Sequence, residues 1–225
     1  MDSIKKYNAW NRLRPWLGGG LLIAMLVLAG YFIYIEYIAP TPLVETKGVT
    51  DQPADASGAM KTDQQKSEYA VPPDHPRELT IQKLGINANI IPISALKDGS
   101  LDAPKTAWDV GWYEKSALPG SGSGASFIDG HVNDAIGTPG IFYKLSLLTK
   151  GDQITIERGD HTTISYVVVE IDQQAIAEVD MNKALSPLDS SKEGLTLMTC
   201  GGVYNATRKT YDDRIIVYAE RDNNG

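Results

Sequence analysis

The sequence predicts an all-β domain: a single closed, mostly antiparallel β-barrel of about eight strands with one or two short helices. Three observations support this prediction. Short runs of alternating or β-branched apolar residues follow one another from residue 79 onward. Turn-forming pairs such as Pro-Gly and Lys-Gly separate these runs, and segments with the period of a helix are few and brief. Ahead of the barrel, the sequence predicts one transmembrane helix and a linker.

The first element is an apolar run at residues 16–35 that contains no charged side chain. As a helix rising about 1.5 Å per residue, it would cross the roughly 30 Å core of a bilayer. The residues before it include four basic side chains, Lys5, Lys6, Arg12 and Arg14. Because positive charge favours the cytoplasmic side, we expect residues 1–15 to be cytoplasmic, residues 16–38 to form a single-pass anchor in the cell membrane, and the rest to be extracytoplasmic.

A cleaved signal peptide is the alternative for this segment. The apolar run is longer than a signal peptide needs, and Pro40 directly after Ala39 would hinder cleavage. We therefore favour a retained anchor.

Residues 39–78 have the composition of a flexible linker, because proline recurs among polar residues and large apolar side chains are scarce. Forty residues can reach on the order of 130 Å when fully extended. Such a linker would hold a catalytic domain, residues 79–225, away from the membrane.

Seven runs within that domain are predicted as strands: 79–84, 88–93, 124–129, 152–157, 162–171, 195–200 and 214–220. Two segments between them have short helical patterns. One lies at residues 138–148 and the other begins near Met181.

Cys200 is the sole cysteine, so the exported domain carries a free thiol in a compartment that usually oxidises thiols. A buried, inert cysteine is the simplest interpretation of such a residue. However, Cys200 ends the run LTLMTC and meets Gly201-Gly202, where the backbone can turn sharply and leave the sulfur at an open rim. His131 likewise follows an apolar run, so the two side chains could meet at one end of the barrel.

Three segments resemble the sortase family of cysteine transpeptidases, in the order in which that family has them. LTLMTCGG resembles its nucleophile strand, ASFIDGHVN its histidine strand, and DRIIVYAE the strand that begins with its catalytic arginine. LGINANIIPI and AWDVGWYEKSALPGSGSG are similar to the family's earlier segments, so the resemblance covers residues 79–221. The short loops and the Cys-Gly-Gly continuation are most similar to the class F group.

The arginine has two candidates. In class F we would expect it slightly earlier, where this chain has Asp212. We choose Arg214 over Arg208, because the spacing from Arg214 to Ala219 resembles the family and a side chain on a strand is held more rigidly than one in a loop.

The resemblance implies that the Cys200 thiolate attacks a carbonyl in an LPxTG-type sorting signal and forms a thioester, which an amine acceptor then resolves. His131 would exchange protons with the leaving and incoming amines, and Arg214 would stabilise the oxyanion. Thr199 would help to line the peptide groove. The implied partners are sorting-signal peptides of surface proteins and an amine acceptor, either a peptidoglycan precursor or a pilin lysine.

No cofactor is predicted. One cysteine and three scattered histidines give no ligand spacing for zinc. Asp212-Asp213 could hold calcium, as in some sortases, although such pairs are more often solvated. Nucleic acid is not an expected partner, since the net charge is -7 without a basic block.

Two other functions remain open. One is a non-catalytic, membrane-anchored β-barrel that binds a partner, in which case Cys200 is incidental. The other is a hydrolytic cysteine peptidase whose acyl-enzyme passes to water.

Overall fold

The computed structural model describes Leu28 and residues 61–97 and 99–222. The predicted cytoplasmic segment, the predicted anchor apart from Leu28 and the first part of the predicted linker lie outside these ranges. No helix within the described ranges is long and apolar enough to span a membrane.

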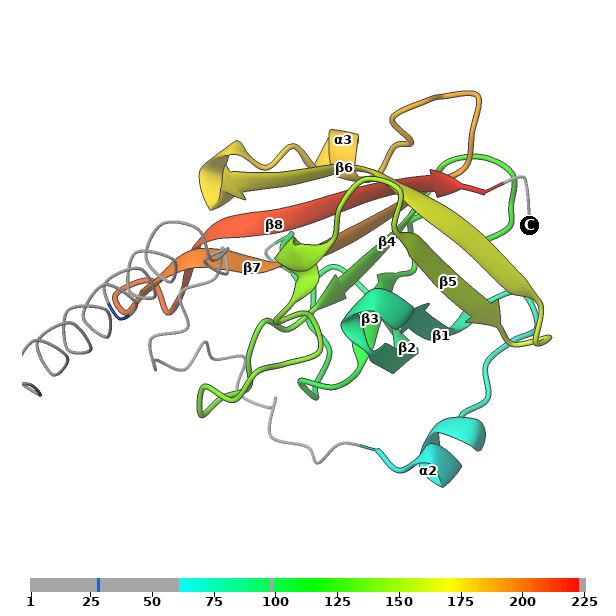
Figure 1. Cartoon of the computed structure of the whole chain (residues 1–225), viewed down its shortest axis with the longest axis horizontal. Helices are drawn as coiled ribbons and strands as arrows, with labels where there is room; N and C mark the ends of the chain where they lie inside the picture. The colour runs from blue at the N-terminus through cyan, green and yellow to red at the C-terminus, as the bar shows by residue number, and fades with distance from the viewer. Residues whose placement is uncertain (1–27, 29–60, 98, 223–225) are drawn as a thin grey trace, which may run out of the picture. The chain divides into compact units, whose positions relative to one another are not determined.

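Eight strands close into a barrel in the order β1-β2-β3-β4-β7-β8-β6-β5 (Figure 1). Their bounds are β1 Pro76–Ile81, β2 Ile86–Ile93, β3 Val110–Tyr113, β4 Ala125–Gly130, β5 Gln153–Arg158, β6 Thr163–Ala175, β7 Gly194–Asn205 and β8 Thr210–Arg221. Six neighbouring pairs are antiparallel, whereas β2–β3 and β4–β7 are parallel. The predicted closed and mostly antiparallel barrel is confirmed.

Buried apolar side chains at alternate positions of the strands fill the barrel interior. In β5, Ile154 and Ile156 are buried, and in β6 the buried residues are Ile164, Tyr166 and Val168. Side chains between them are more exposed, as expected when successive residues point to opposite faces. This apolar interior is the main core of the domain.

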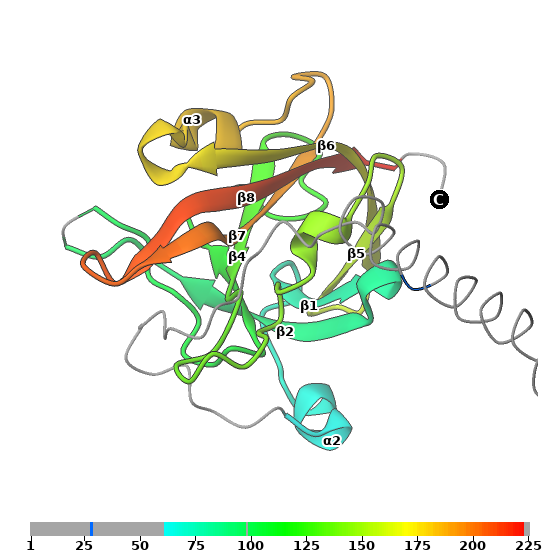
Figure 2. The same cartoon turned by 60° about the vertical axis from the view of Figure 1, so that its left-hand side comes forward.

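A second, smaller core lies on the outer face of β4, β7 and β8. It contains Phe127, Met198, Ile216 and Tyr218, whose neighbours Ile128, Leu197 and Val217 belong to the interior. The connection between β6 and β7, which includes α3, packs over this outer face (Figure 2). Both faces of β4, β7 and β8 are therefore buried. The cavity described below lies on their outer face, next to this smaller core.

The helices are short, as predicted. Their bounds are α2 Asp63–Ser67, η2 Gln82–Leu84, η3 Leu145–Leu147, η4 Ile176–Glu178 and α3 Met181–Ala184. The helix expected near Met181 is α3, whose N-terminal amides are capped by the Asp180 carboxylate. The segment 138–148 forms turns and only the single 3₁₀ turn η3.

The folded part of the chain starts earlier than the predicted boundary at residue 79. That boundary falls inside β1, and α2 lies within the segment 39–78 that the composition assigned to the linker. Arg77 is one reason: it is buried and its guanidinium donates to the backbone carbonyls of Lys66, Ser67 and Tyr69. A segment with the composition of a linker can therefore still fold when a buried arginine donates hydrogen bonds to several of its backbone carbonyls.

Candidate active site

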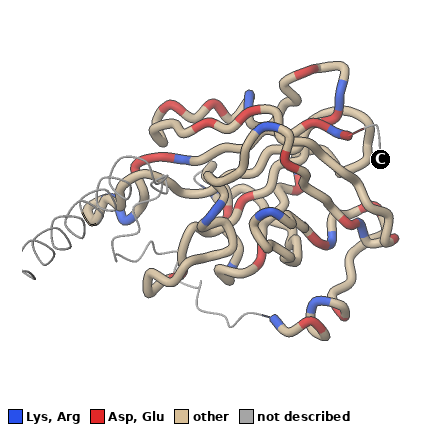
Figure 3. Tube along the Cα trace, in the orientation of Figure 1, with Lys and Arg blue, Asp and Glu red and all other residues tan. Residues whose placement is uncertain are grey.

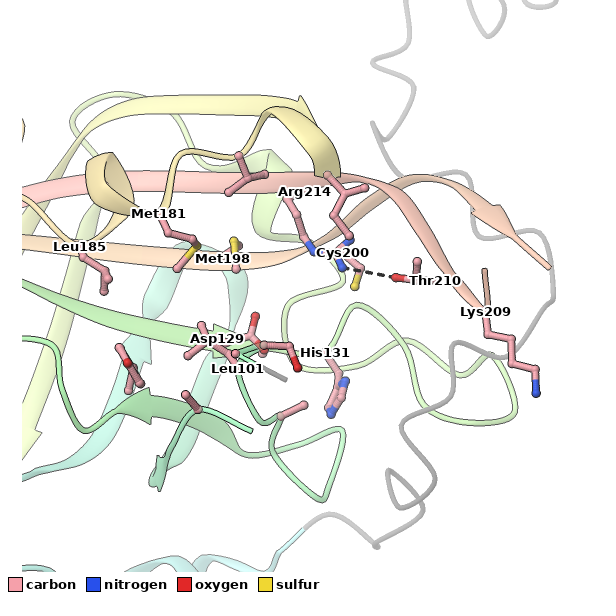
Figure 4. Close-up of a pocket in the computed structure, with 18 residues that line it drawn as sticks. Leu101, Asp129, His131, Met181, Leu185, Met198, Cys200, Lys209, Thr210 and Arg214 are labelled. Atoms are coloured by element: carbon pink, nitrogen blue, oxygen red, sulfur yellow. Dashed lines mark hydrogen bonds between the residues drawn. The ribbon is translucent and has the colours of Figure 1, made fainter. Parts of the chain in front are cut away.

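The predicted catalytic side chains share the outer face of three neighbouring strands. His131 follows β4 at a position in step with Phe127 and Asp129, while Cys200 in β7 is in step with Met198. Arg214 in β8 is in step with Ile216. All three line one cavity of about 690 Å³ (Figure 4). The structure thus brings together Cys200, His131 and Arg214.

Cys200 and Arg214 are direct neighbours across the β7–β8 ladder. Residues opposite each other in an antiparallel pair have Cβ atoms about 5 Å apart on the same face. The Arg214 guanidinium donates to the carbonyls of Asp213 at 2.8 Å and Tyr211 at 3.3 Å, and to the Thr210 hydroxyl at 3.3 Å. These bonds hold a permanent cation beside the sulfur (Figure 4).

His131 faces this pair from the other side of the cavity (Figure 4). The residue is 9% exposed, and its Nε2 lies 2.6 Å from the carbonyl oxygen of Pro104. A carbonyl oxygen only accepts hydrogen bonds, so Nε2 carries a proton and Nδ1 is the nitrogen left for proton exchange.

The cavity opens where β4 and β7 separate. Their parallel pairing ends at Asp129 and Met198, and the Thr199 hydroxyl then donates to the Gly130 carbonyl at 2.7 Å. Thr199, which was predicted to help line the peptide groove, is 0% exposed and is not among the residues that line this cavity. It lies on the opposite face from Cys200, and its hydroxyl links β7, which carries Cys200, to the end of β4, which precedes His131.

Cys200 does not end its strand as the sequence suggested. β7 continues to Asn205 through an irregularity in the pairing with β8 between Gly201 and Tyr204. Gly202 adopts φ +73°, where a Cβ would lie 2.6 Å from the Asp213 carboxylate. The glycine pair therefore permits a bulge next to Cys200 rather than a strand end, and the cysteine is partly exposed.

The other arginine candidate lies elsewhere. Arg208 is in the turn between β7 and β8, forms an ion pair with Asp212 and does not line the cavity. Asp213 accepts a hydrogen bond from Gln173, so the two neighbouring aspartates have different partners. Within the described residues, no three His, Cys, Asp or Glu side chains gather as metal ligands.

The residues close to His131 in sequence have different surroundings. Asp129 lines the cavity. Asp134 accepts hydrogen bonds from the backbone N–H groups of Ile136 and Thr138 and so stabilises the turn after the histidine. Sequence reasoning missed Pro104, because a backbone carbonyl carries no residue-type signal.

The rest of the cavity is largely apolar. Met181, Leu185 and Met198 lie at one end, and Lys209 lies at the other (Figure 4). The sequence analysis also missed this wall, although the alternation of the run LTLMTC could have placed Met198 on the same face as Cys200. Over the described part of the trace, lysine and arginine are interspersed with acidic residues and form no long basic tract (Figure 3).

A family model described as the sortase domain matches residues 79–222. The chain belongs to the sortase family. Sortases are transpeptidases, enzymes that act on peptide bonds, and the family match assigns this protein to that class. No curated protein matches the chain.

Solved sortase structures have the same fold. Sortase A from Corynebacterium diphtheriae is 25% identical, with a TM-score of 0.51 and coverage of 69% of this chain and 65% of that one. The pilus-related sortase C of Group B Streptococcus is 18% identical, with a TM-score of 0.52 and coverage of 80% and 82%. Sortase C-1 from Actinomyces oris is 20% identical, with a TM-score of 0.51 and coverage of 86% and 94%. These relatives are named as class A and class C, so the class F subtype stays a prediction.

Proposed function

We propose that this sortase is anchored in the cell membrane and cleaves an LPxTG-type sorting signal outside the cell, transferring the acyl part to an amine acceptor. The observation that supports the chemistry is the shared cavity of Cys200, His131 and Arg214 on one face of β4, β7 and β8. The apolar run at residues 16–35 supports the anchor.

In the first half-reaction, the Cys200 thiolate adds to the scissile carbonyl carbon. The negative oxygen of the tetrahedral intermediate receives N–H donors from Arg214, whose bonds to described residues use three of its five donors. The C–N bond then breaks, Nδ1 of His131 passes the proton that it took from the Cys200 thiol to the leaving amine, and a thioester remains on the sulfur.

In the second half-reaction, a primary amine attacks the thioester carbonyl. His131 takes the proton from the incoming nitrogen as the C–S bond breaks, and a new amide forms while the Cys200 thiolate returns. The overall reaction exchanges one peptide bond for another and consumes no cofactor.

The apolar wall suits the leucine and proline of the sorting signal. Leu101, Met181, Leu185 and Met198 can bury these side chains, with the following residues directed toward Cys200. The acceptor class, a peptidoglycan precursor or a pilin lysine, is not distinguished by these contacts.

The rival of a non-catalytic binding barrel is less consistent with this arrangement, since an incidental cysteine has no reason to share a cavity with a histidine and a strand-paired arginine. A hydrolytic peptidase would use the same residues. It differs only in whether water or an amine resolves the thioester.

The test is intact-mass analysis of the full-length chain in detergent after incubation with an LPxTG-type peptide, with and without triglycine. We expect an adduct on Cys200 that triglycine converts to ligated peptide, and no adduct with Cys200→Ala. Release of free acid alone, unaffected by triglycine, would assign a peptidase. Absence of any adduct, together with a thiol that resists alkylation in the folded protein, would favour the binding barrel.

A further inference from the structure

The ring of His131 is held by a loop rather than by a side chain. Its Nε2 donates to the carbonyl of Pro104, in the connection between β2 and β3. That carbonyl can orient the ring only if the loop around it is itself fixed. The residues that fix this loop are therefore relevant to the proton-transfer geometry proposed above.

Asp109 organises the loop from within. It is 5% exposed, and its Oδ2 accepts a hydrogen bond of 2.9 Å from the Thr106 hydroxyl, which in turn accepts from the Asp109 N–H at 3.1 Å. Between these residues, the Ala107 carbonyl accepts from the Ile141 N–H at 2.8 Å. Phe142, which follows Ile141, donates its N–H to the His131 carbonyl at 2.9 Å, so the segment bonded to this loop also contacts the histidine backbone.

A buried carboxylate needs a compensating cation, and here it comes from the segment that precedes the barrel. Lys61 Nζ lies 2.8 Å from Asp109 Oδ1, with side chains 31% and 7% exposed. Among the described residues, Lys61 is the cation paired with Asp109.

Lys61 belongs to an ordered segment, residues 61–75, which we call the N-terminal clasp. The Tyr69 hydroxyl donates to the Ile90 carbonyl at 2.9 Å, and Lys66 Nζ donates to the Asn87 carbonyl at 2.8 Å. Burial, and secondarily the Asp109 carboxylate, raises the pKa of Tyr69, so its hydroxyl stays protonated as a donor. The Lys61 ammonium also lies 5.4 Å from the centre of the Tyr69 ring, and Arg77 collects three carbonyls of the clasp.

We propose that Lys61 and Asp109 are positioning residues for His131: by fixing the loop that carries the Pro104 carbonyl, they keep the imidazole with Nε2 protonated and Nδ1 toward the cavity. Within the N-terminal clasp, Lys61 is then the residue that acts on His131, through Asp109 and the Pro104 loop. The kinetic consequence of this inference rests on the proposed transpeptidation, whereas the state of the imidazole does not.

The variants are Lys61→Met and Asp109→Asn in the full-length chain in detergent, with Lys61→Arg as the conservative replacement. The matched control is Lys66→Met, which removes another lysine of the clasp that contacts β2 but not the loop of Pro104. Because the Lys61 side chain is partly exposed, we expect Lys61→Met to fold, so it tests the inference even if Asp109→Asn does not fold.

Two readouts are measured on each variant: steady-state transfer of an LPxTG-type peptide to triglycine, and the ¹⁵N resonances of the His131 ring. For Lys61→Met and Asp109→Asn we expect kcat to fall by about tenfold or more with little change in KM, because small displacements of a reacting group are costly. The ring resonances should lose the pattern of a single Nε2–H form. Lys61→Arg should restore both readouts, and Lys66→Met should change neither.

Wild-type kcat and ring resonances in Lys61→Met, with the protein folded, would overturn the inference. So would equal losses in Lys61→Met and Lys66→Met, because the effect would then be general to the clasp. If the wild-type protein transfers no peptide, the proposed function fails. The ring resonances then decide the positioning inference alone: a change in Lys61→Met but not in Lys66→Met supports it, and no change overturns it.

Discussion

Two arginines six positions apart show how the local environment assigns a chemical role. Arg208 is more than half exposed and paired with Asp212 in a turn, where its charge is already neutralised and screened by water. Arg214 is held by two carbonyls and a hydroxyl at the edge of the cavity and directly faces Cys200 across the ladder. Of the two arginines, Arg214 is therefore the one that we propose to stabilise the oxyanion formed when Cys200 attacks its substrate.

Replacing Arg214 should therefore remove transition-state stabilisation. We expect Arg214→Lys and Arg214→Ala to lower kcat/KM for peptide transfer by about 10²- to 10³-fold, because an ammonium cannot present the planar set of donors. Arg208→Ala should stay within about twofold of the wild type. Steady-state kinetics of the three variants test this, and a larger loss in Arg208→Ala than in Arg214→Ala would reverse the assignment.

The sequence could point to candidate site residues only where the residue type or a family motif indicates the chemistry. A lone cysteine and a histidine after a glycine were not decisive alone; the resemblance of three segments to the sortase family selected Cys200, His131 and Arg214 together. Thr199 was proposed for the groove because it precedes Cys200 in sequence, whereas consecutive residues of β7 point to opposite faces and Thr199 is buried. The Pro104 carbonyl could not be predicted, since it contacts His131 from 27 positions away through backbone alone.

At the scale of elements, alternation predicted seven of the eight strands, but it did not predict β3. β3 has four residues, and its Gly111 lies against Ile93 so closely that a Cβ would be 2.8 Å from that side chain. Because a glycine makes this close contact, β3 lacks the alternation of apolar side chains by which the other strands were predicted. Similarly, α2 has no buried residue, and its position depends on the distant Arg77.

The turn that leads into β5 provides a pH-dependent test of element stability. Burial alone would raise the pKa of Asp152, but hydrogen bonds from Lys83 and from the Thr149 N–H and hydroxyl outweigh it, so its pKa lies below the ordinary value. A lowered folded-state pKa means that the stabilisation is complete above the unfolded pKa of about 3.9 and is lost as the pH falls through the folded value.

Asp152→Asn should therefore lower the free energy of unfolding by about 1 kcal/mol at pH 7, with most of the loss due to the Lys83 pair. The difference from the wild type should be constant between pH 7 and about 5 and should shrink below about pH 4. Denaturant unfolding across this range measures it, with Lys83→Met as the control that removes the other partner. A difference that grows on acidification would mean that the carboxylate is not stabilised in its charged form.

At the scale of the whole molecule, Glu193 links distant parts of the barrel. Its carboxylate, 1% exposed, accepts hydrogen bonds from the N–H groups of Gly120 and Gly122, from the Tyr166 hydroxyl and from Arg221. Burial and the neighbouring Glu193 carboxylate raise the pKa of Tyr166, which keeps the hydroxyl protonated as a donor. The loop before β4 is thereby joined to β6 and β8 next to the start of β7.

Glu193→Gln should weaken this junction without touching the chemistry. The amide replaces one acceptor oxygen by a donor and leaves Arg221 without its counter-charge, so we expect the free energy of unfolding to fall by about 3 kcal/mol and Tm by roughly 10 °C. Cys200 lies seven residues further along β7, roughly 20 Å away, so kcat of the folded variant should be unchanged.

Lys192→Met is the matched control: it removes the adjacent, more exposed pair with Glu220 and should leave Tm nearly unchanged. Thermal unfolding and peptide transfer measured on the same samples separate the two effects, and a fall in kcat at temperatures where Glu193→Gln is fully folded would show that the junction also acts on the cavity.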